Sequence, residues 1–107
     1  MQPEQPIFHI TSRSQWEAAR GEGVYRPPSL QSEGFIHCCR AEQLAGVRER
    51  YFRGQTALML LTIDPSKLTA AVREEDAHGR GETFPHLYGP LNLNAVVEVC
   101  DLPAADT

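Results

Sequence analysis

The distribution of apolar residues along the chain predicts several strands, one of them buried on both faces. Four apolar segments carry the β-branched and aromatic residues that favour strands: 7–10, 34–38, 57–63 and 95–102. The segment 57–63 is apolar almost throughout and stops at Asp64-Pro65, which is typical of a strand covered on both sides. Shorter strands are expected at Val24-Tyr25 and from Val72 onward.

Two main helices are predicted between these strands. Ser12 followed by Gln15 fits a capping box, so one helix is expected to begin near Ser12. Gly21 and Gly23 are expected to stop it. A second helix is expected from about Arg40 to Phe52. Its apolar residues at helical spacing are Leu44, Val47 and Tyr51.

Prolines and polar residues mark the connections. Residues 26–29, Arg-Pro-Pro-Ser, are expected to form extended loop, because each proline removes a backbone donor and restricts the residue before it. Residues 64–67 predict a turn or a single helical turn, and residues 74–81 a polar loop. Residues 84–90 form a rigid, aromatic-bearing segment.

This order of elements predicts an α+β fold with a small, mixed, mostly antiparallel sheet and two main helices packed on it. A chain of 107 residues suffices for a single domain, 1–107. We expect its ordered part to run from about residue 6 to residue 103, with a frayed tail. A monomer is expected.

Composition and charge narrow the class of protein. The net charge of −4 argues against general nucleic-acid binding. No apolar stretch approaches the roughly 20 residues that span a bilayer, so no membrane partner is expected. The polar start lacks the regions of a secretory signal, and the three cysteines are an odd number with two adjacent. A reduced, cytoplasmic protein is therefore expected.

Three of the four histidines stand in or beside predicted strands. His9 lies inside an apolar strand, His37 precedes the second helix, and His86 lies in the rigid segment 84–90. We expect these three to line one pocket, the alternative being that each is a buried, hydrogen-bonded structural residue. The fourth, His78, is expected to be solvated in its polar loop.

Other polar residues near these histidines in the sequence can contribute to the same pocket. Ser29, Ser32 and Glu33 precede the strand of His37, and Glu82 lies close to His86. A metal site is not favoured, because the histidines are separated by 28 and 49 residues and form no local pair. Nothing else in the sequence supports Cys38 or Cys39 as a nucleophile, and glycine-rich phosphate loops are absent.

Several segments together match the pattern of one known family. They are Phe8-His9-Ile10, Tyr25-Arg26-Pro27-Pro28-Ser29, Gly34-Phe35-Ile36-His37-Cys38 and Phe84-Pro85-His86-Leu87-Tyr88-Gly89-Pro90-Leu91. From about Ile7 to Leu102, the chain resembles the domain-of-unknown-function family 952. One departure is Cys39, where that family usually has serine or threonine, so a hydroxyl cap on the second helix is missing.

The resemblance implies an ADP-ribosyltransferase-like fold, because the family is grouped with those proteins. The grouping implies a split, twisted sheet that holds a nucleotide-sized cleft. His9 matches the first-strand residue that engages NAD in such proteins, and Tyr25 or His37 matches the middle position. His86 falls where a late glutamate is expected. A histidine cannot supply that fixed negative charge, so phosphate chemistry is favoured over ordinary NAD-dependent transfer.

The first hypothesis is therefore an enzyme acting on NAD or another nucleotide-like small molecule. Its predicted catalytic residues are His9, His37 and His86. The residues predicted to bind the ligand are Arg26 and Ser29 at a phosphate, Tyr25 or Tyr88 against a ring, and Glu82. The alternatives are a non-catalytic small-ligand binding module and a structural or protein-interaction domain on the same scaffold.

Overall fold

The structure is a computed structural model that describes residues 5–76 and 79–102, so His78 and the predicted tail lie outside the described residues. The strands are β1 (Ile7–Ser12), β2 (Val24–Tyr25), β3 (Ile36–His37), β4 (Leu58–Ile63), β5 (Ala71–Glu75), β6 (Phe84–Tyr88), β7 (Leu91–Asn92) and β8 (Val96–Leu102). The α-helices are α1 (Arg13–Glu22), α2 (Pro28–Glu33) and α3 (Leu44–Tyr51), and short 3₁₀ turns span Ala41–Gln43, Pro65–Lys67 and Leu93–Ala95.

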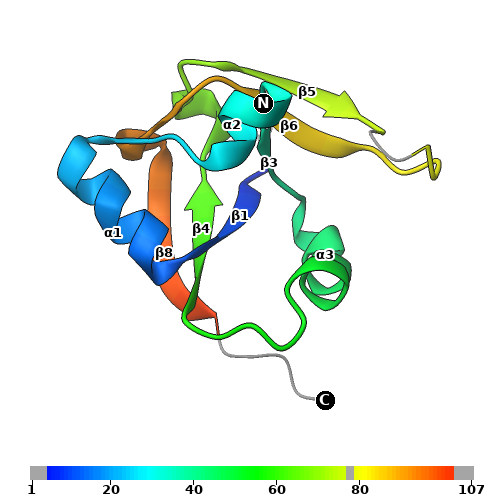
Figure 1. The fold of residues 1–107 in the computed structure, drawn as a ribbon. Helices are drawn as coiled ribbons and strands as arrows, with labels where there is room; N and C mark the ends of the chain where they lie inside the picture. The colour runs from blue at the N-terminus through cyan, green and yellow to red at the C-terminus, as the bar shows by residue number, and fades with distance from the viewer. Residues whose placement is uncertain (1–4, 77–78, 103–107) are drawn as a thin grey trace.

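The central sheet has the order β1-β4-β8, with β4 between the two others (Figure 1). Both pairings are antiparallel, and β4 meets β1 in a register that sets His9 opposite Leu61. Leu61 and Ile63 are completely buried, which confirms that the apolar run before Asp64 forms a central strand. In Figure 1, α1 lies on the β8 side of this sheet and α3 lies on the other side of the picture, beyond the edge strand β1.

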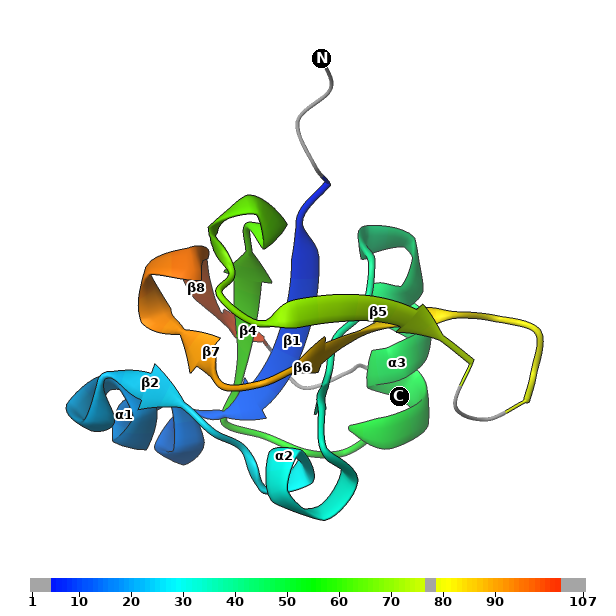
Figure 2. The same cartoon turned by 90° about the horizontal axis from the view of Figure 1, so that it is seen from above.

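A second sheet of order β3-β6-β5 crosses over the first, as Figure 2 shows for β5, β6, β1 and β4. The two sheets join at Phe8 and Cys39, whose backbone N–H groups donate to each other's carbonyls at 2.7 and 2.8 Å. On the other side of the same segment, the N–H of Cys38 donates to the carbonyl of Pro85 at 3.1 Å. Residues 36–39 therefore pass from the edge of β6 to the edge of β1.

The overall architecture is an α+β fold with three helices and antiparallel sheets. Every pairing between the described strands is antiparallel, so the parallel component expected from the sequence is not found among them. Within the described residues, no helix is long and apolar enough to cross a membrane.

The first helix begins and ends where the sequence predicts. The Ser12 hydroxyl accepts a hydrogen bond from the backbone N–H of Gln15 at 3.1 Å, and Gly23 closes the helix in the left-handed region with φ of 87°. Trp16 and Ala19 are buried. They place α1 against the sheet and fix the direction in which the chain enters β2.

The helix α2 corrects the prediction of extended loop at residues 26–29. It begins at Pro28, directly after the extended N-cap residue Pro27. Proline is well suited to the first turn of a helix, because the backbone N–H that it lacks would have no partner there. The pair of prolines therefore starts a helix here, and Glu33 at its end lies next to β3.

The second predicted helix begins later than expected. Residues Ala41–Gln43 form a 3₁₀ turn, and α3 follows from Leu44. The Gln43 side chain makes one half of a capping box at this turn, since its Oε1 accepts from the N–H of the N-cap residue Arg40 at 2.9 Å. The predicted strand 34–38 is also shorter, at Ile36–His37, whereas residues 84–88 form β6.

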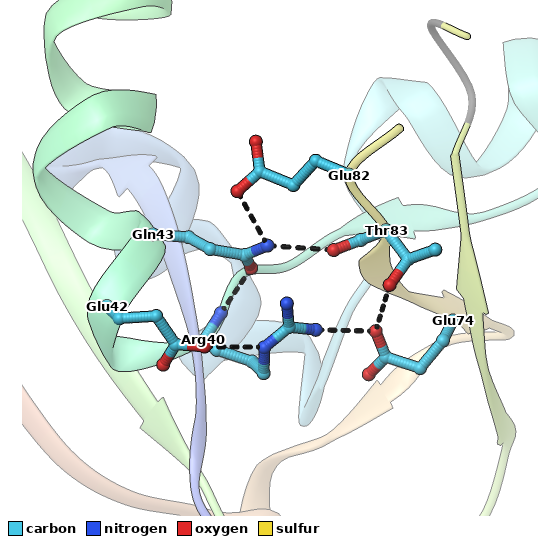
Figure 3. A network of polar contacts seen from close by, with 6 residues as sticks. All are labelled: Arg40, Glu42, Gln43, Glu74, Glu82 and Thr83. Carbon is cyan, nitrogen blue, oxygen red and sulfur yellow. Dashed lines mark hydrogen bonds and ion pairs between the residues drawn. The ribbon is translucent and has the colours of Figure 1, made fainter. Parts of the chain in front are cut away.

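A polar network ties this 3₁₀ turn to the second sheet (Figure 3). The amide nitrogen of Gln43 donates to the carbonyl of Thr83 at 2.7 Å and to Glu82 at 3.2 Å. The guanidinium of Arg40 donates to Glu42 at 2.8 Å and to Glu74 at 2.7 Å. Gln43 is 5% exposed, so its bonds are shielded from water, while the ion pairs around it are solvated.

Replacing Gln43 by alanine is expected to lower the free energy of unfolding by about 1–2 kcal/mol, because the N–H of Arg40 and the carbonyl of Thr83 both lose a partner. Urea unfolding measures the change, and the exposed Gln31→Ala serves as the control. Equal midpoints for both variants would show that the network contributes nothing to stability.

Candidate functional site

A pocket of about 570 Å³ opens between the two sheets and is lined by His9, His37 and His86. Its lining also includes residues of α2 and α3, the first residue of β4 and a residue at the start of α1. The volume falls within the range of about 300–1,000 Å³ that is usual for small-molecule sites. The fold thus brings together three histidines that are far apart in the sequence.

The register of β3 and β6 explains why two of these histidines meet. His37 and His86 are directly opposite each other in this antiparallel pair, and their rings lie edge to face with centroids 5.5 Å apart. Residues at opposed positions of neighbouring strands have side chains on the same face of the sheet. Phe35 completes the cluster, with its ring stacked on His86 at 4.1 Å.

His9 is held from both sides. Its Nδ1 lies 2.5 Å from the carbonyl oxygen of His37, and its Nε2 lies 2.7 Å from the hydroxyl of Tyr25. Burial lowers the pKa of His9 to about 4, so the ring is neutral near pH 7. A carbonyl only accepts, so Nδ1 carries the proton, and Nε2 lies against the hydroxyl of Tyr25. These contacts favour a positioning role for His9 and leave neither ring nitrogen open to a ligand.

Tyr25 connects His9 to the start of α1. Its hydroxyl lies 2.9 Å from the hydroxyl of Thr11, which in turn lies 3.0 Å from the side-chain oxygen of Gln15. Burial raises the pKa of Tyr25 to about 12, so it stays protonated. Tyr25 therefore holds the wall of the pocket through its hydroxyl, and its ring lies tilted against that of His9 at 5.2 Å.

His37 and Glu33 form a carboxylate–histidine pair at the mouth of the pocket. The Nε2–H of His37 donates to Glu33 at 2.9 Å, across one turn between the end of α2 and β3. The side chain of His37 is 44% exposed, so it is accessible from the solvent. Its Nδ1 has no hydrogen-bond partner among residues 5–76 and 79–102.

His86 and Glu75 form a second carboxylate–histidine pair, in which the histidine is buried and the glutamate is partly exposed. The Nδ1–H of His86 donates to Glu75 at 2.9 Å, and the His86 side chain is 3% exposed. Tyr88 also donates to Glu75, and these two bonds, with that of Tyr88 the larger effect, lower the pKa of Glu75 below its ordinary value. Within the described part of the chain, Nε2 of His86 has no partner.

Of the five residues predicted to bind a ligand, two line the pocket and three lie outside it. Tyr25 and Ser29 line the pocket, although the hydroxyl of Ser29 already donates to the carbonyl of Phe35 at 3.0 Å. Arg26 lines a separate depression of about 120 Å³. Glu82 belongs to the network of Figure 3, and Tyr88 lies outside the pocket, below the guanidinium of Arg73.

Apart from Tyr25, the aromatic side chains in the pocket wall were not predicted from the sequence as ligand-binding residues. Three of the four phenylalanines of the chain line it: Phe8, Phe52 and Phe84. Tyr51, 44% exposed at the end of α3, belongs to the same lining. Apolar walls with a few polar groups at defined points are the usual composition of a small-molecule site.

The two adjacent cysteines also line the pocket but do not have the properties of a nucleophile. Both are buried, and burial raises the pKa of the Cys39 thiol to about 11 and that of Cys38 further. Both are therefore thiols near neutral pH. Within the described residues, no three His, Cys, Asp or Glu side chains are grouped as a metal ion would require.

The fold matches that of a solved bacterial protein. The crystal structure of CC0527 from Caulobacter crescentus superposes with a TM-score of 0.83 at 35% sequence identity, covering 92% of this chain and 86% of that one. The solution NMR structure of CC0527 gives a TM-score of 0.80 at 35% identity, with 92% and 84% covered. No curated protein matches the chain in sequence.

The family resemblance is confirmed over most of the chain. The family model described as "Protein of unknown function (DUF952)" matches residues 10–99, which contain both carboxylate–histidine pairs. The structural likeness to CC0527 covers 92% of the chain. This chain belongs to the DUF952 family.

Proposed function

We propose that this domain is an enzyme that binds a nucleotide-like small molecule in the histidine-lined pocket and transfers a group with His37 and His86 as acid and base. The observation that carries the proposal is the pair of opposed histidines, each hydrogen-bonded to its own glutamate, with rings 5.5 Å apart. Their lining of one pocket gives both access to the same ligand.

This arrangement suits proton transfer. A histidine that donates one ring N–H to a carboxylate is held in a single tautomer, so its other nitrogen is a proton acceptor when the ring is neutral. Here the acceptors are Nδ1 of His37 and Nε2 of His86. Two such groups, one neutral and one protonated, supply a general base and a general acid together.

An ADP-ribosyltransferase-like fold with an NAD-like ligand agrees with several features of the pocket. His9 on the first strand and Tyr25 on the next lie in its wall, and Phe35 and His86 offer stacked rings nearby. His86 occupies the position where a catalytic glutamate was expected, but Glu33 supplies a carboxylate to the same pocket lining. The Glu33 carboxylate accepts a hydrogen bond from His37. Its ability to stabilise an oxocarbenium ion therefore depends on whether His37 is protonated.

Direct phosphate chemistry is less well supported. Arg26, which was expected to grip a phosphate, lines a different depression, and the hydroxyl of Ser29 is already committed to the carbonyl of Phe35. Phosphate groups in proteins are usually held by arginine, lysine or free backbone N–H groups. The main pocket contains no arginine or lysine among its described lining residues.

A non-catalytic binding module is the second candidate. The observation in its favour is that His9, the first-strand histidine, has both ring nitrogens occupied. Binding without turnover would still need the apolar wall and His37, but it would not need a proton acceptor on His86. Detection of a released product, such as nicotinamide from NAD, separates the enzyme from the binding module.

Replacing His37 by alanine is expected to abolish ligand-induced stabilisation while changing the free energy of unfolding by no more than about 0.5 kcal/mol, because the side chain is exposed. A thermal-shift panel of NAD, ADP-ribose, nicotinamide, nucleosides and nucleotides measures the response of wild type and variant. Arg20→Ala, which removes an exposed ion pair outside the pocket, is the matched control. A wild type that responds to none of these ligands would refute the proposal.

A further inference from the structure

We infer that the part of the ligand held in the main pocket is an uncharged or cationic nucleoside, a flat heteroaromatic ring with its ribose, and carries no phosphate. This inference rests on the proposed function and specifies the class of ligand. It follows from the charges of the pocket wall, from the position of Arg26 outside the pocket and from the apolar character of the lining.

The pocket wall has no fixed positive charge. Of its described lining residues, Glu33 is the only one with a side chain of the Asp, Glu, Lys or Arg type. The three histidines do not give the pocket wall a net positive charge. His9 is neutral near pH 7, and a positive charge on His37 or His86 is already matched by Glu33 or Glu75. A phosphate in this pocket would lose its hydration without gaining a cation.

Arg26 is separated from the main pocket by buried side chains. It follows Tyr25, which is 2% exposed, and precedes Pro27, which is also buried. Both neighbours line the main pocket and the small depression alike, so they form the wall between the two. Arg26 is therefore placed to contact groups outside the main pocket, not the part of a ligand that is inside it.

The neutral groups of the wall match a nucleoside. Phe8, Phe52 and Phe84 provide apolar surface for a heteroaromatic ring. Gln15 and Gln55 provide uncharged amides of the kind that bond ribose hydroxyls and ring amides. The carboxylate of Glu33 tolerates a neutral or positively charged ring but repels an anion.

The test compares each nucleoside with its own 5′-monophosphate: adenosine with AMP, and nicotinamide riboside with nicotinamide mononucleotide. Isothermal titration calorimetry on the full chain at constant ionic strength is expected to show at least one nucleoside binding about tenfold or more tightly than its phosphate ester. Glu33→Gln is expected to reduce this preference severalfold. Glu17→Gln removes a helix carboxylate outside the pocket and is expected to leave the preference unchanged.

The outcomes distinguish the inference from the proposal on which it rests. Monophosphates that bind as tightly as their nucleosides, or more tightly, would overturn the inference while leaving nucleotide binding in place. A preference that persists unchanged in Glu33→Gln would overturn the electrostatic reason for it. Binding by no member of either pair would overturn both. Circular dichroism confirms that Glu33→Gln remains folded, since Glu33 is at the end of α2.

Discussion

Between pH 6.5 and pH 4, the domain is expected to lose about 3 kcal/mol of stability through His9 alone. In the folded protein, burial lowers the pKa of this ring from 6.5 to about 4. The unfolded chain therefore binds a proton at His9 in this range, whereas the folded protein does not. Each unit of pKa difference corresponds to about 1.4 kcal/mol.

The sign of this effect follows from proton linkage. Where the unfolded state binds more protons, the free energy of unfolding rises with pH. The contribution of His9 is therefore fully present above pH 6.5, falls as the pH is lowered, and is lost once the pH has passed through the folded pKa of about 4. The cost arises because a protonated ring would have to remain shielded from water between the carbonyl of His37 and the hydroxyl of Tyr25.

Urea unfolding of the wild type and of His9→Gln from pH 7.5 to pH 4 measures the contribution as a difference between two curves. Glutamine keeps a polar side chain at this position but does not titrate, so the curve of the variant is expected to be flatter. Protonation of surface carboxylates affects both proteins equally and cancels. Parallel curves would contradict the prediction, and an NMR titration of the His9 ring in the wild type tests the same pKa without any substitution.

Features that depend on a few neighbouring residues were predicted well. The start of α1 at Ser12 and its end at Gly23 need only a hydroxyl in reach of the first turn and a residue that adopts the left-handed conformation. The central position of β4 follows from a run of apolar residues too long to have one face in water. Such signals are contained in the local sequence and do not need the rest of the fold.

The helix α2 was missed because a pair of prolines is compatible with two different backbone structures. Consecutive prolines are compatible with extended loop and also with the first turn of a helix. Which one forms depends on the residues that follow, and Gly34 allows a short helix to close there with φ of 88°. The sequence was equally unable to show which of Tyr25, the last residue of β2, and Arg26, which follows it, faces the pocket. Tyr25 is buried and Arg26 is exposed, which removes Arg26 from the pocket.

The partners of the histidines were the least predictable feature of the site. Glu75 was assigned to a polar loop because it lies in the run Glu74-Glu75-Asp76, yet it is the last residue of β5. The pairing of β5 with β6 places it diagonally from His86, within reach of the ring. This register is a product of tertiary pairing, and no spacing within the sequence indicates it.

The second large effect is expected from His86. Its replacement by alanine is predicted to lower the free energy of unfolding by about 2–4 kcal/mol, because a buried ring and a charge-assisted hydrogen bond are lost together. The residue is 2% exposed, and its ring stacks on Phe35 with an interplanar angle of 16°. The neighbouring His37→Ala, in the same pocket but exposed, is expected to be nearly neutral for stability.

His86→Phe separates the two contributions of this residue. Phenylalanine keeps a flat ring against Phe35 but has no nitrogen, so it is expected to recover part of the stability that alanine loses. It leaves Glu75 with its bond from Tyr88 and without the bond from His86. Urea midpoints compare the three proteins, and equal midpoints for alanine and wild type would show that the ring is not packed as described. A stable His86→Phe that still binds ligand but yields no product would assign His86 to proton transfer. If the same variant retains turnover, His86 is a structural residue and His37 alone carries the chemistry.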